Sequence, residues 1–560
     1  MAPMRLRLRR PATTPARPRP PWPEGWRRPR WARRGTTIGT LDGGVRALVD
    51  PAGLVTPAGG DWSLDWWVGA EDRWHLPAEE VAVRQRLVSN APVVETRVRI
   101  PSGDAVHRAY AARTLSGDDV VVVEVENASK VPFAVALAVR PAGATATGEV
   151  GRIELEDLVV HVDGEPGLVL QRAPGRAALG SAEAGDAADA VLTGGALEAR
   201  GLAPVTCSGG LANAAFLFPL AHTAVLRVVL PLGAGRVAPA EVPSAAEVAS
   251  GWSRQAGAGT RVELPDRRLR DAVAASARHL LLADAQPAVA EGLDWLGHHG
   301  AAAGILRELV DPDHLGAVAP GRLLAALGLH WDLTRGLGLA GEAVLAVAAA
   351  VAALGASTDP ADRRAGLDAL PAVGRLLRAA GEDRAASDLA RLELAAGTAP
   401  APTLGDLLRD ASATWTWPGP MGAHDPAVNA TLVGLVRALL VDDQLDPAAP
   451  HDHLDLGPAV PDAWLGQGWE VHDLPTRHGW LSYAVRWHGD RPALLWQLDL
   501  AHDRPVVVRA PGLDPTWHHA DPVGEELLAP VALPQAAPRR GLSLPVSIEP
   551  LHRRPTGEGS

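Results

Sequence analysis

Three acidic residues beside tryptophans are the best candidates for acid–base chemistry in this sequence. Glu291 and Asp294 lie close to Trp295, and Asp332 follows Trp331. An indole that shields a carboxyl group from water raises its pKa and lets it act as a proton donor. We therefore expect Asp294 and Asp332 to be the catalytic residues if the protein is an enzyme. The alternative is that Glu291 and Asp332 are solvated residues on helix surfaces.

A tryptophan-rich segment, "DWSLDWWVGAEDRWHLP" at residues 61–77, is typical of a sugar-binding surface. Indole rings stack on pyranose faces, and carboxylates and guanidinium groups bind hydroxyls. The substrate-binding residues that we expect here are Trp66, Trp67, Asp72, Arg73 and Trp74. The alternative is structural: Trp62 and Trp66 would belong to a sandwich core, and Arg73 would pair with Asp72 or Glu71.

A second aromatic segment, "TWTWPGPMGAHDP" at residues 414–426, is a Gly/Pro-rich loop that also carries His424 and Asp425. Loops at the rim of a helical bundle often hold binding groups. We expect Trp415 and Trp417 to form a further stacking wall for the ligand, although one of the two could instead be packed. The two aromatic segments are predicted to converge where the first β-domain meets the helices.

The histidine patterns do not predict a metal site. The pairs at 298–299 and 518–519 and the segment "HDHLD" (451–455) lack the helical i,i+4 spacing with an acid that zinc enzymes use. There is also no Gly-x-Ser-x-Gly elbow, no P-loop and no dinucleotide-binding fingerprint. We expect no metal and no cofactor. The single cysteine, Cys207, excludes an intramolecular disulfide.

The charge is distributed unevenly along the 560 residues, whose net charge is −12. The first 34 residues hold eleven arginines and one glutamate, so the remainder is strongly acidic and repels nucleic acid. The basic segment is interrupted by prolines and is predicted to be disordered; the alternative is that it touches RNA or anionic lipid. The apolar run at 343–354 is too short to span a bilayer, and no signal peptide is evident. We expect a cytoplasmic protein without nucleic-acid or membrane partners.

Hydrophobic periodicity predicts a multidomain protein with both α and β parts. Several alternating segments indicate an N-terminal antiparallel β-sandwich. The segment "LPDRRLRDAVAASARHLLLAD" (264–284) then has helical spacing behind Asp266 as N-cap, and Asp425-Pro426 signals another helix start. Residues 481–487 and 494–500 form a predicted hairpin in a C-terminal antiparallel β-domain. The predicted boundaries are 1–35 (basic tail), 36–250 (sandwich), 251–450 (helical-hairpin domain), 451–535 (β-domain) and 536–560 (flexible tail).

The domain order and three segments resemble the six-hairpin glycosidases, the glucoamylase and glycogen-debranching group. "IGTLDGGVRALVDPAGLV" (38–55) is similar to the start of their sandwich, "GWSRQAGAGTRVELPDRRLRDAVAASARHLLL" (251–282) to the bridge into their first toroid helix, and "GRLLAALGLHWDLTRG" (321–336) to a recurrent helix. The resemblance implies a central (α/α) toroid and an oligo- or polysaccharide substrate of the α-glucan type. It also implies an inverting mechanism in which one carboxylic acid donates a proton and one carboxylate activates water.

The sequence also departs from that family. The helical part contains no arginine–aspartate segment after aromatic residues and no Glu-x-Asn-Gly loop, and 266–443 is too short for twelve helices. We therefore expect an abridged toroid. The alternative function is a non-catalytic glycan- or protein-binding scaffold that has lost its catalytic carboxylates. An inverting enzyme holds its two carboxyl groups roughly 6.5–9.5 Å apart across one pocket, so the placement of the acids distinguishes the two functions.

Overall fold

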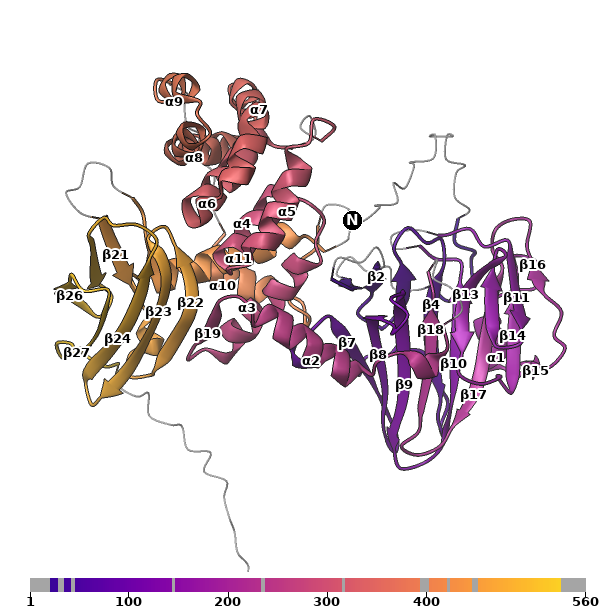
Figure 1. Cartoon of the computed structure of the whole chain (residues 1–560). Helices are drawn as coiled ribbons and strands as arrows, with labels where there is room; N and C mark the ends of the chain where they lie inside the picture. The colour runs from indigo at the N-terminus through magenta and orange to yellow at the C-terminus, as the bar shows by residue number, and fades with distance from the viewer. Residues whose placement is uncertain are drawn as a thin grey trace, which may run out of the picture.

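The computed structural model describes residues 21–28, 35–41, 46–143, 147–232, 237–314, 318–392, 402–419, 424–445 and 452–534. Three parts follow one another along the chain: a two-sheet β part, a group of helices and a smaller β part (Figure 1). This arrangement confirms the predicted order of a β, a helical and a β region. Most of the basic tail and all of the C-terminal tail, 536–560, lie outside the described residues.

The N-terminal part consists of two nine-stranded antiparallel sheets. The first sheet contains, in spatial order, β1 (Thr36–Gly39), β2 (Arg46–Val49), β3 (Val55–Pro57), β4 (Ser63–Gly69), β10 (Phe133–Arg140), β17 (Asn213–Leu220), β14 (Arg176–Gly180) and β15 (Leu197–Glu198), with β5 (Trp74–His75) beside β4. The second contains β16 (Val205–Thr206), β11 (Arg152–Glu156), β12 (Val159–Val162), β13 (Glu165–Leu170), β18 (Val225–Leu230), β9 (Asp119–Ser129), β8 (Gly103–Arg113), β7 (Val93–Ile100) and β6 (Val83–Leu87).

The valine run of β9 shows why these segments form buried strands. Val121, Val123 and Val125 face the core between the two sheets. Val120 and Val122 face the opposite side, where α2 (Ala245–Ala256) covers the sheet. Because successive strand residues point to opposite faces, a strand covered on both sides needs a continuous apolar run. The first sheet is covered on its outer face by α1 (Ala187–Leu192). Two short 3-10 helices follow strands: η1 (Val88–Asn90) lies between β6 and β7, and η2 (Pro239–Glu241) lies between β18 and α2.

Part of the predicted basic tail packs on the sandwich instead of being disordered. Trp22 is buried, and the Arg140 guanidinium lies 5.6 Å from the centre of its ring. The backbone N–H of Arg27 donates to Asp186 at 3.0 Å, and Asp186 also forms a fully buried ion pair with Arg140. The prediction of disorder over residues 1–35 is therefore wrong for 21–28.

The helical part begins at the N-cap that the sequence predicts. The Asp266 carboxylate accepts hydrogen bonds from the backbone N–H groups of Arg268 and Leu269, and the Asp425 carboxylate caps the last helix in the same way. The helices are α3 (Arg267–Leu281), α4 (Pro287–Trp295), α5 (His299–Leu309), α6 (Pro320–Thr334), α7 (Leu337–Leu354), α8 (Pro360–Ala379), α9 (Asp383–Leu389), α10 (Leu404–Asp410) and α11 (Pro426–Leu440). An (α/α) toroid, complete or abridged, stays a prediction.

Among the helices of the described residues, α7 is long and apolar enough to cross a membrane by length and composition alone. Its buried residues, among them Leu339, Ala343, Val347 and Leu354, recur at helical spacing and belong to the core of the helical part. That spacing places one face of α7 against its neighbours.

The C-terminal part consists of a five-stranded and a four-stranded sheet. The first is β19 (Arg261–Glu263), β22 (Trp469–Thr476), β23 (Gly479–His488), β24 (Arg491–Leu500) and β27 (Val523–Leu527); the second is β20 (Val441–Asp442), β21 (Asp452–Leu456), β25 (Val506–Ala510) and β26 (Asp514–His519), with η4 (Asp462–Trp464) between β21 and β22. The predicted hairpin is confirmed as β23 and β24, in which Tyr483 pairs with Trp496. The sheets are antiparallel except for β21 and β25, which are parallel.

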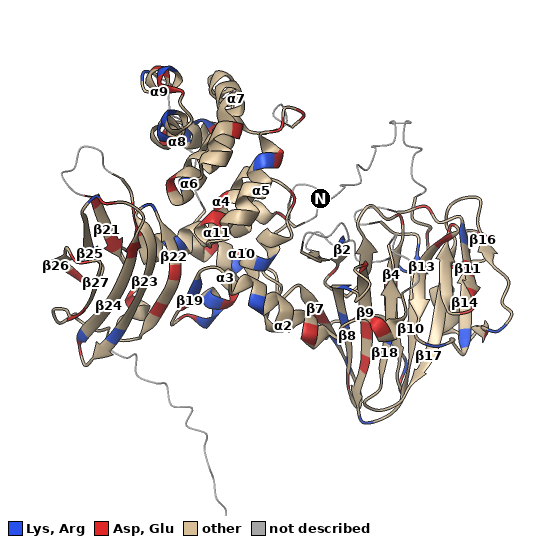
Figure 2. Cartoon of the chain, viewed as in Figure 1, with Lys and Arg blue, Asp and Glu red and all other residues tan. Residues whose placement is uncertain are grey.

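The helices and the C-terminal sheets share one hydrophobic core. Leu293 of α4, Trp469 of β22 and Leu481 of β23 belong to the same cluster of buried side chains. Strand β19 precedes the helices in sequence and pairs with β22, so the C-terminal sheet already begins before α3. Acidic and basic residues are interspersed along the ribbons of all three parts (Figure 2).

Candidate functional site

The tryptophans of segment 61–77 are placed inside the sandwich. Trp66 and Trp67 are neighbours on β4 and point to opposite faces of the sheet; Trp66 is 0% exposed and Trp67 is 2% exposed. Trp66 lies in the core between the sheets, where its Nε1 donates to the Ala52 carbonyl at 3.0 Å. Trp67 and Trp74 pack in a separate cluster beneath α1. A buried ring presents no face to a sugar, so the predicted stacking role of Trp66 and Trp67 is not supported, whereas the alternative of core packing is.

The polar residues of the same segment bind each other. The His75 ring bridges Asp72 and Glu80, with its Nε2 2.9 Å from Asp72 and its Nδ1 3.0 Å from Glu80. Arg73 pairs with Glu80 at 2.5 Å. Arg73 therefore has an ion-pair partner, as the structural alternative predicts, but the partner is Glu80 and not Asp72 or Glu71. These four side chains, of which Glu80 lies just beyond the segment, hold the β4–β5 turn in place.

The second aromatic pair also packs against protein. Trp417 is buried, and its Nε1 donates to the Leu407 carbonyl at 3.0 Å. Trp415 is half-buried against both the sandwich core and the helical core, and the Arg268 guanidinium lies 5.8 Å from its ring centre. Trp66, Trp67 and Trp417 thus lie in three separate clusters of buried side chains, and Trp415 packs against those of Trp66 and Trp417.

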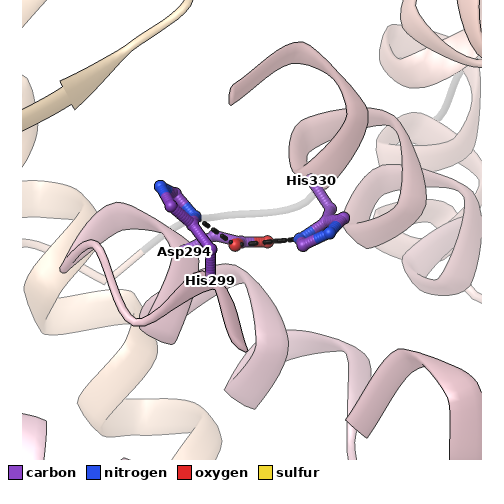
Figure 3. Close-up of side chains that lie close together, drawn as sticks. All are labelled: Asp294, His299 and His330. Carbon is purple, nitrogen blue, oxygen red and sulfur yellow. Dashed lines mark hydrogen bonds and ion pairs between the residues drawn. The ribbon is translucent and has the colours of Figure 1, made fainter. Parts of the chain in front are cut away.

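Asp294 lies at the C-terminal end of α4 and holds two histidines (Figure 3). Its side chain is 0% exposed, and it accepts hydrogen bonds from His299 Nδ1 at 2.8 Å and from His330 Nδ1 at 3.0 Å. A carboxylate that accepts from Nδ1 fixes the tautomer of each ring and leaves Nε2 as the free nitrogen. His299 also packs edge-on against Trp480, with ring centres 5.4 Å apart. Asp294 therefore positions two imidazoles and does not itself face an open pocket.

Asp332 is the centre of an arginine cluster. Its carboxylate, 2% exposed, is bound by Arg375 at 2.6 Å and 2.9 Å and by Arg335 and Arg477 at 3.3 Å each. Arg477 also pairs with buried Asp443 at 2.9 Å. Guanidinium groups from α8, from the end of α6 and from the β22–β23 turn thus surround one carboxylate. Because both oxygens are engaged, Asp332 is poorly placed to activate a water molecule.

A third acid, Glu291, differs from these two. It lies one helical turn before Asp294 in α4, and burial raises its pKa to about 7. The positive charge of Arg322 opposes this rise, and the negative charge of Asp294 adds to it. Its Oε1 atom is buried without a hydrogen-bond partner. Glu291 is thus the acid in this region that is suited to holding a proton near neutral pH.

A cleft of ≈ 430 Å³ lies between the sandwich and the helices, where the sequence predicts a ligand site. None of the predicted tryptophans line it. Its edge includes an ion pair between Arg46 of β2 and Asp284, which joins the two parts. The residues that line the cleft are Thr37, Arg46, Ala47, Leu48, Thr56, Pro57, Ala58, Gly59, Gly60, His279, Leu282, Ala283, Asp284, Gln286, His424 and Pro426.

Two of these lining residues, His279 and His424, have unused hydrogen-bonding atoms. His279 Nε2 donates to the Thr414 carbonyl at 2.9 Å, while its Nδ1 is buried without a partner. Both ring nitrogens of His424 are buried without a partner of normal geometry, although Trp417 backbone and Asn429 lie close enough to favour its charged form. The rings are 4.9 Å apart. Buried polar atoms are rarely left unpaired, so these nitrogens point to a bound ligand or water.

Burial also fixes the charge of these two histidines. It lowers the pKa of His279 to about 4, with a smaller contribution from the charge of Arg278. It lowers the pKa of His424 to about 3, and His279 contributes in the same direction. Both rings are therefore neutral at pH 7; His279 can accept one further hydrogen bond at Nδ1, and His424 can donate one and accept one. The cleft carries neutral hydrogen-bonding groups in a partly apolar wall.

Sequence reasoning identified some of these residues and missed others. His424 is part of the predicted binding loop, whereas His279 looks like an ordinary core position of an amphipathic helix. Arg375 and Arg477 carry no local signal, because each lies far along the chain from Asp332. Comparison with protein-family models and with curated proteins finds no match.

Proposed function

We propose that the protein binds a neutral polyhydroxylated ligand, a mono- or oligosaccharide, in the cleft between the sandwich and the helices. The observation that carries this proposal is the pair of neutral imidazoles, His279 and His424, which line the cleft and which hold buried nitrogens without a hydrogen-bond partner. The cleft volume is within the range of about 300–1,000 Å³ that is typical of small-molecule sites. The α-glucan class is taken from the resemblance described above.

The placement of the acids favours binding without catalysis. Inverting hydrolysis requires two carboxyl groups that face one sugar across a pocket. Asp294 is bound by two histidines and Asp332 by three arginines, and both are buried. Neither residue lines the cleft of His279 and His424. The site proposed for binding is thus separate from the acids that we expected to be catalytic.

The test is calorimetric titration with maltose, trehalose and glucan oligomers, comparing the unaltered protein with His424→Leu. Because no internal hydrogen bond of normal geometry depends on His424, leucine removes a cleft-lining imidazole and its two nitrogens at little cost to folding. We expect His424→Leu to weaken binding by about tenfold or more. A tenfold change in Kd corresponds to about 1.4 kcal/mol, which is the size expected for one lost hydrogen bond. His518→Leu, at an exposed position in β26, is the matched control and should bind normally. No binding of any panel sugar, or equal affinity in His424→Leu, would contradict the proposal.

Hydrolysis of an α-glucosidic bond is the second candidate function, and the pKa of Glu291 is the observation that favours it. A carboxyl group with a pKa of about 7 can donate a proton to a leaving oxygen. If the protein is a hydrolase, Glu291→Gln should slow the release of glucose from these oligosaccharides by about 100-fold or more, because the amide cannot donate an acidic proton. A complete absence of glucose release by the unaltered protein, or an unchanged rate in Glu291→Gln, would exclude this role.

A further inference from the structure

Three metal-ligating side chains gather at one end of the C-terminal sheets. Asp452 begins β21, His478 lies in the turn between β22 and β23, and His502 follows β24. Donor atoms of the three side chains all lie within 4.8 Å of one another. Asp452 belongs to the segment "HDHLD", from which sequence spacing predicts no metal site. The cleft and the acids of α4 and α6 make no use of this cluster.

The cluster contains buried polar atoms that lack partners. Asp452 is 2% exposed, and neither of its oxygens has a hydrogen-bond partner. The nearest cation is Arg504, whose Nη2 is 3.1 Å from Oδ1 but whose side chain is 58% exposed. His478 is 0% exposed, and its Nε2 has no partner of normal geometry. Burying a carboxylate without hydrogen bonds is costly, and a bound cation removes that cost.

The spacing of the two imidazoles fits a metal ion better than a hydrogen bond. His478 Nδ1 and His502 Nε2 are 3.4 Å apart, which is long for a hydrogen bond. In a tetrahedral site with Zn–N bonds of about 2.0–2.1 Å, two nitrogens lie about 3.3–3.4 Å apart. By contrast, the Asp294 oxygens lie 2.8 Å and 3.0 Å from the histidine nitrogens that they bind, which are ordinary hydrogen-bond lengths. The C-terminal cluster is therefore the better metal site of the two.

We propose that Asp452, His478 and His502 bind a divalent transition-metal ion, best matched by zinc, with a fourth position open to water. Two imidazoles and one carboxylate are a donor set that zinc accepts. The backbone of His453 lies next to the His478 ring and would orient it from behind, as partners of metal-bound histidines do. Before binding, the single proton of neutral His502 lies on the Nε2 that faces His478, because Nδ1 accepts from the Arg504 backbone N–H. Binding requires this proton to move through solvent from Nε2 to Nδ1, with no net release from the two neutral rings, and the Arg504 N–H must turn away.

The site would join the two C-terminal sheets. Asp452 belongs to the four-stranded sheet, whereas His478 and His502 flank strands of the five-stranded sheet. A metal ion bound only by the folded state stabilises it in proportion to the logarithm of its concentration above the dissociation constant. The expected role is structural, with the open position available to a further ligand.

The test uses untagged full-length protein, stripped with EDTA, desalted and titrated with ZnCl2 by calorimetry. We expect one zinc ion per chain and a rise in the unfolding temperature of the C-terminal part. His502→Ala should weaken zinc binding by at least about 100-fold. Loss of a residue that only hydrogen-bonds to a metal ligand weakens metal binding by roughly 10–100-fold, and loss of a ligand itself should weaken it more. His502 lies outside the strands and is only partly buried, so this variant should remain folded. CoCl2 in place of ZnCl2 should give the intense visible absorption of tetrahedral coordination.

Two control variants separate this site from the other histidines. His299→Ala removes a partner of Asp294 and should leave zinc binding unchanged, as should His518→Ala at an exposed position. The proposal is overturned if the stripped protein binds no zinc, if His502→Ala binds zinc as tightly as the unaltered protein, or if His299→Ala loses the binding instead. None of these results depends on sugar binding, so the proposed function and the metal site are tested independently.

Discussion

Replacing Asp332 with alanine is expected to lower the free energy of unfolding of the helical and C-terminal parts by about 3–5 kcal/mol. The carboxylate, 2% exposed, is the anion shared by Arg375, Arg335 and Arg477. Without it, three guanidinium groups remain close together at a partly buried position with no common counter-ion, although Arg477 keeps Asp443. Removing one member of a buried ion cluster lowers the free energy of unfolding by more than the intact cluster adds to it, because the remaining charges stay desolvated.

The measurement is urea denaturation followed by far-ultraviolet circular dichroism, which reports mainly on the helices. Asp368→Ala is the matched control: Asp368 pairs with Arg364 one helical turn away, and both side chains are 59% exposed. An exposed pair of this kind is worth about 0.3–0.5 kcal/mol. Asp332→Asn, which keeps the shape but removes the charge, should also be clearly destabilised. A loss of less than about 1 kcal/mol in Asp332→Ala would show that the arginines are well solvated without it.

The arginine cluster also shows what local sequence could not reveal about the site. The sequence marks Asp332 only as an acid that follows Trp331, and both residues are buried. Its charge partners, however, come from 43 and 145 residues further along the chain. A pattern that spans a few residues contains no information on such contacts, because they depend on how α6, α8 and the β22–β23 turn pack. The same limitation hid the pairing of the two cleft histidines, because His279 lies in α3 and His424 in the segment before α11.

The elements themselves were predictable where the signal is local. The cap at Asp266, the helix start at Asp425-Pro426 and the β23–β24 hairpin each depend on a few adjacent residues, and all are confirmed. The sequence alone could also have shown that Trp66 and Trp67 do not stack on the same ligand. Once residues 63–69 are assigned to a strand, adjacent side chains must point to opposite faces. By contrast, the pairing of β19 with β22 and the parallel pair β21–β25 join segments that no local period connects.

The second large prediction concerns pH and the turn that begins at Asp50, in which the Gly53 N–H donates to the Asp50 carbonyl at 3.0 Å. The Asp50 carboxyl is 3% exposed, and burial raises its pKa to about 7, an effect that nearby Asp65 reinforces. Its Oδ1 accepts from the backbone N–H groups of Ala52 at 2.7 Å and Leu54 at 2.9 Å, while Oδ2 has no partner. In the unfolded chain this carboxyl has a pKa of about 3.9. At pH values between these two pKa values, Asp50 is protonated in the folded state and ionised in the unfolded state.

The contribution of Asp50 to stability is therefore fully present below about pH 4 and is lost as the pH rises to about 7. Three pKa units at about 1.36 kcal/mol each give a loss of about 4 kcal/mol over that interval. The asparagine side chain of the Asp50→Asn variant keeps an acceptor for Ala52 and Leu54 and has the shape of the protonated acid, but it does not ionise. The stability of Asp50→Asn relative to the unaltered sandwich should therefore increase by up to about 4 kcal/mol between pH 4 and pH 8.

The difference between the two proteins isolates Asp50 from the other titrating groups of the sandwich. His107, whose pKa burial lowers to about 3, makes the sandwich less stable as the pH falls, but it is present in both proteins and cancels. Denaturation of the two proteins at pH 4.5, 6 and 7.5 measures the effect, with Asp157→Asn as a control at an exposed position of the same sandwich. A difference between Asp50→Asn and the unaltered protein that stays constant over this range would mean that Asp50 is charged in the folded state throughout. The turn would then be held by an ionised carboxylate, and the two N–H groups of Ala52 and Leu54 would have to outweigh the cost of burying its charge.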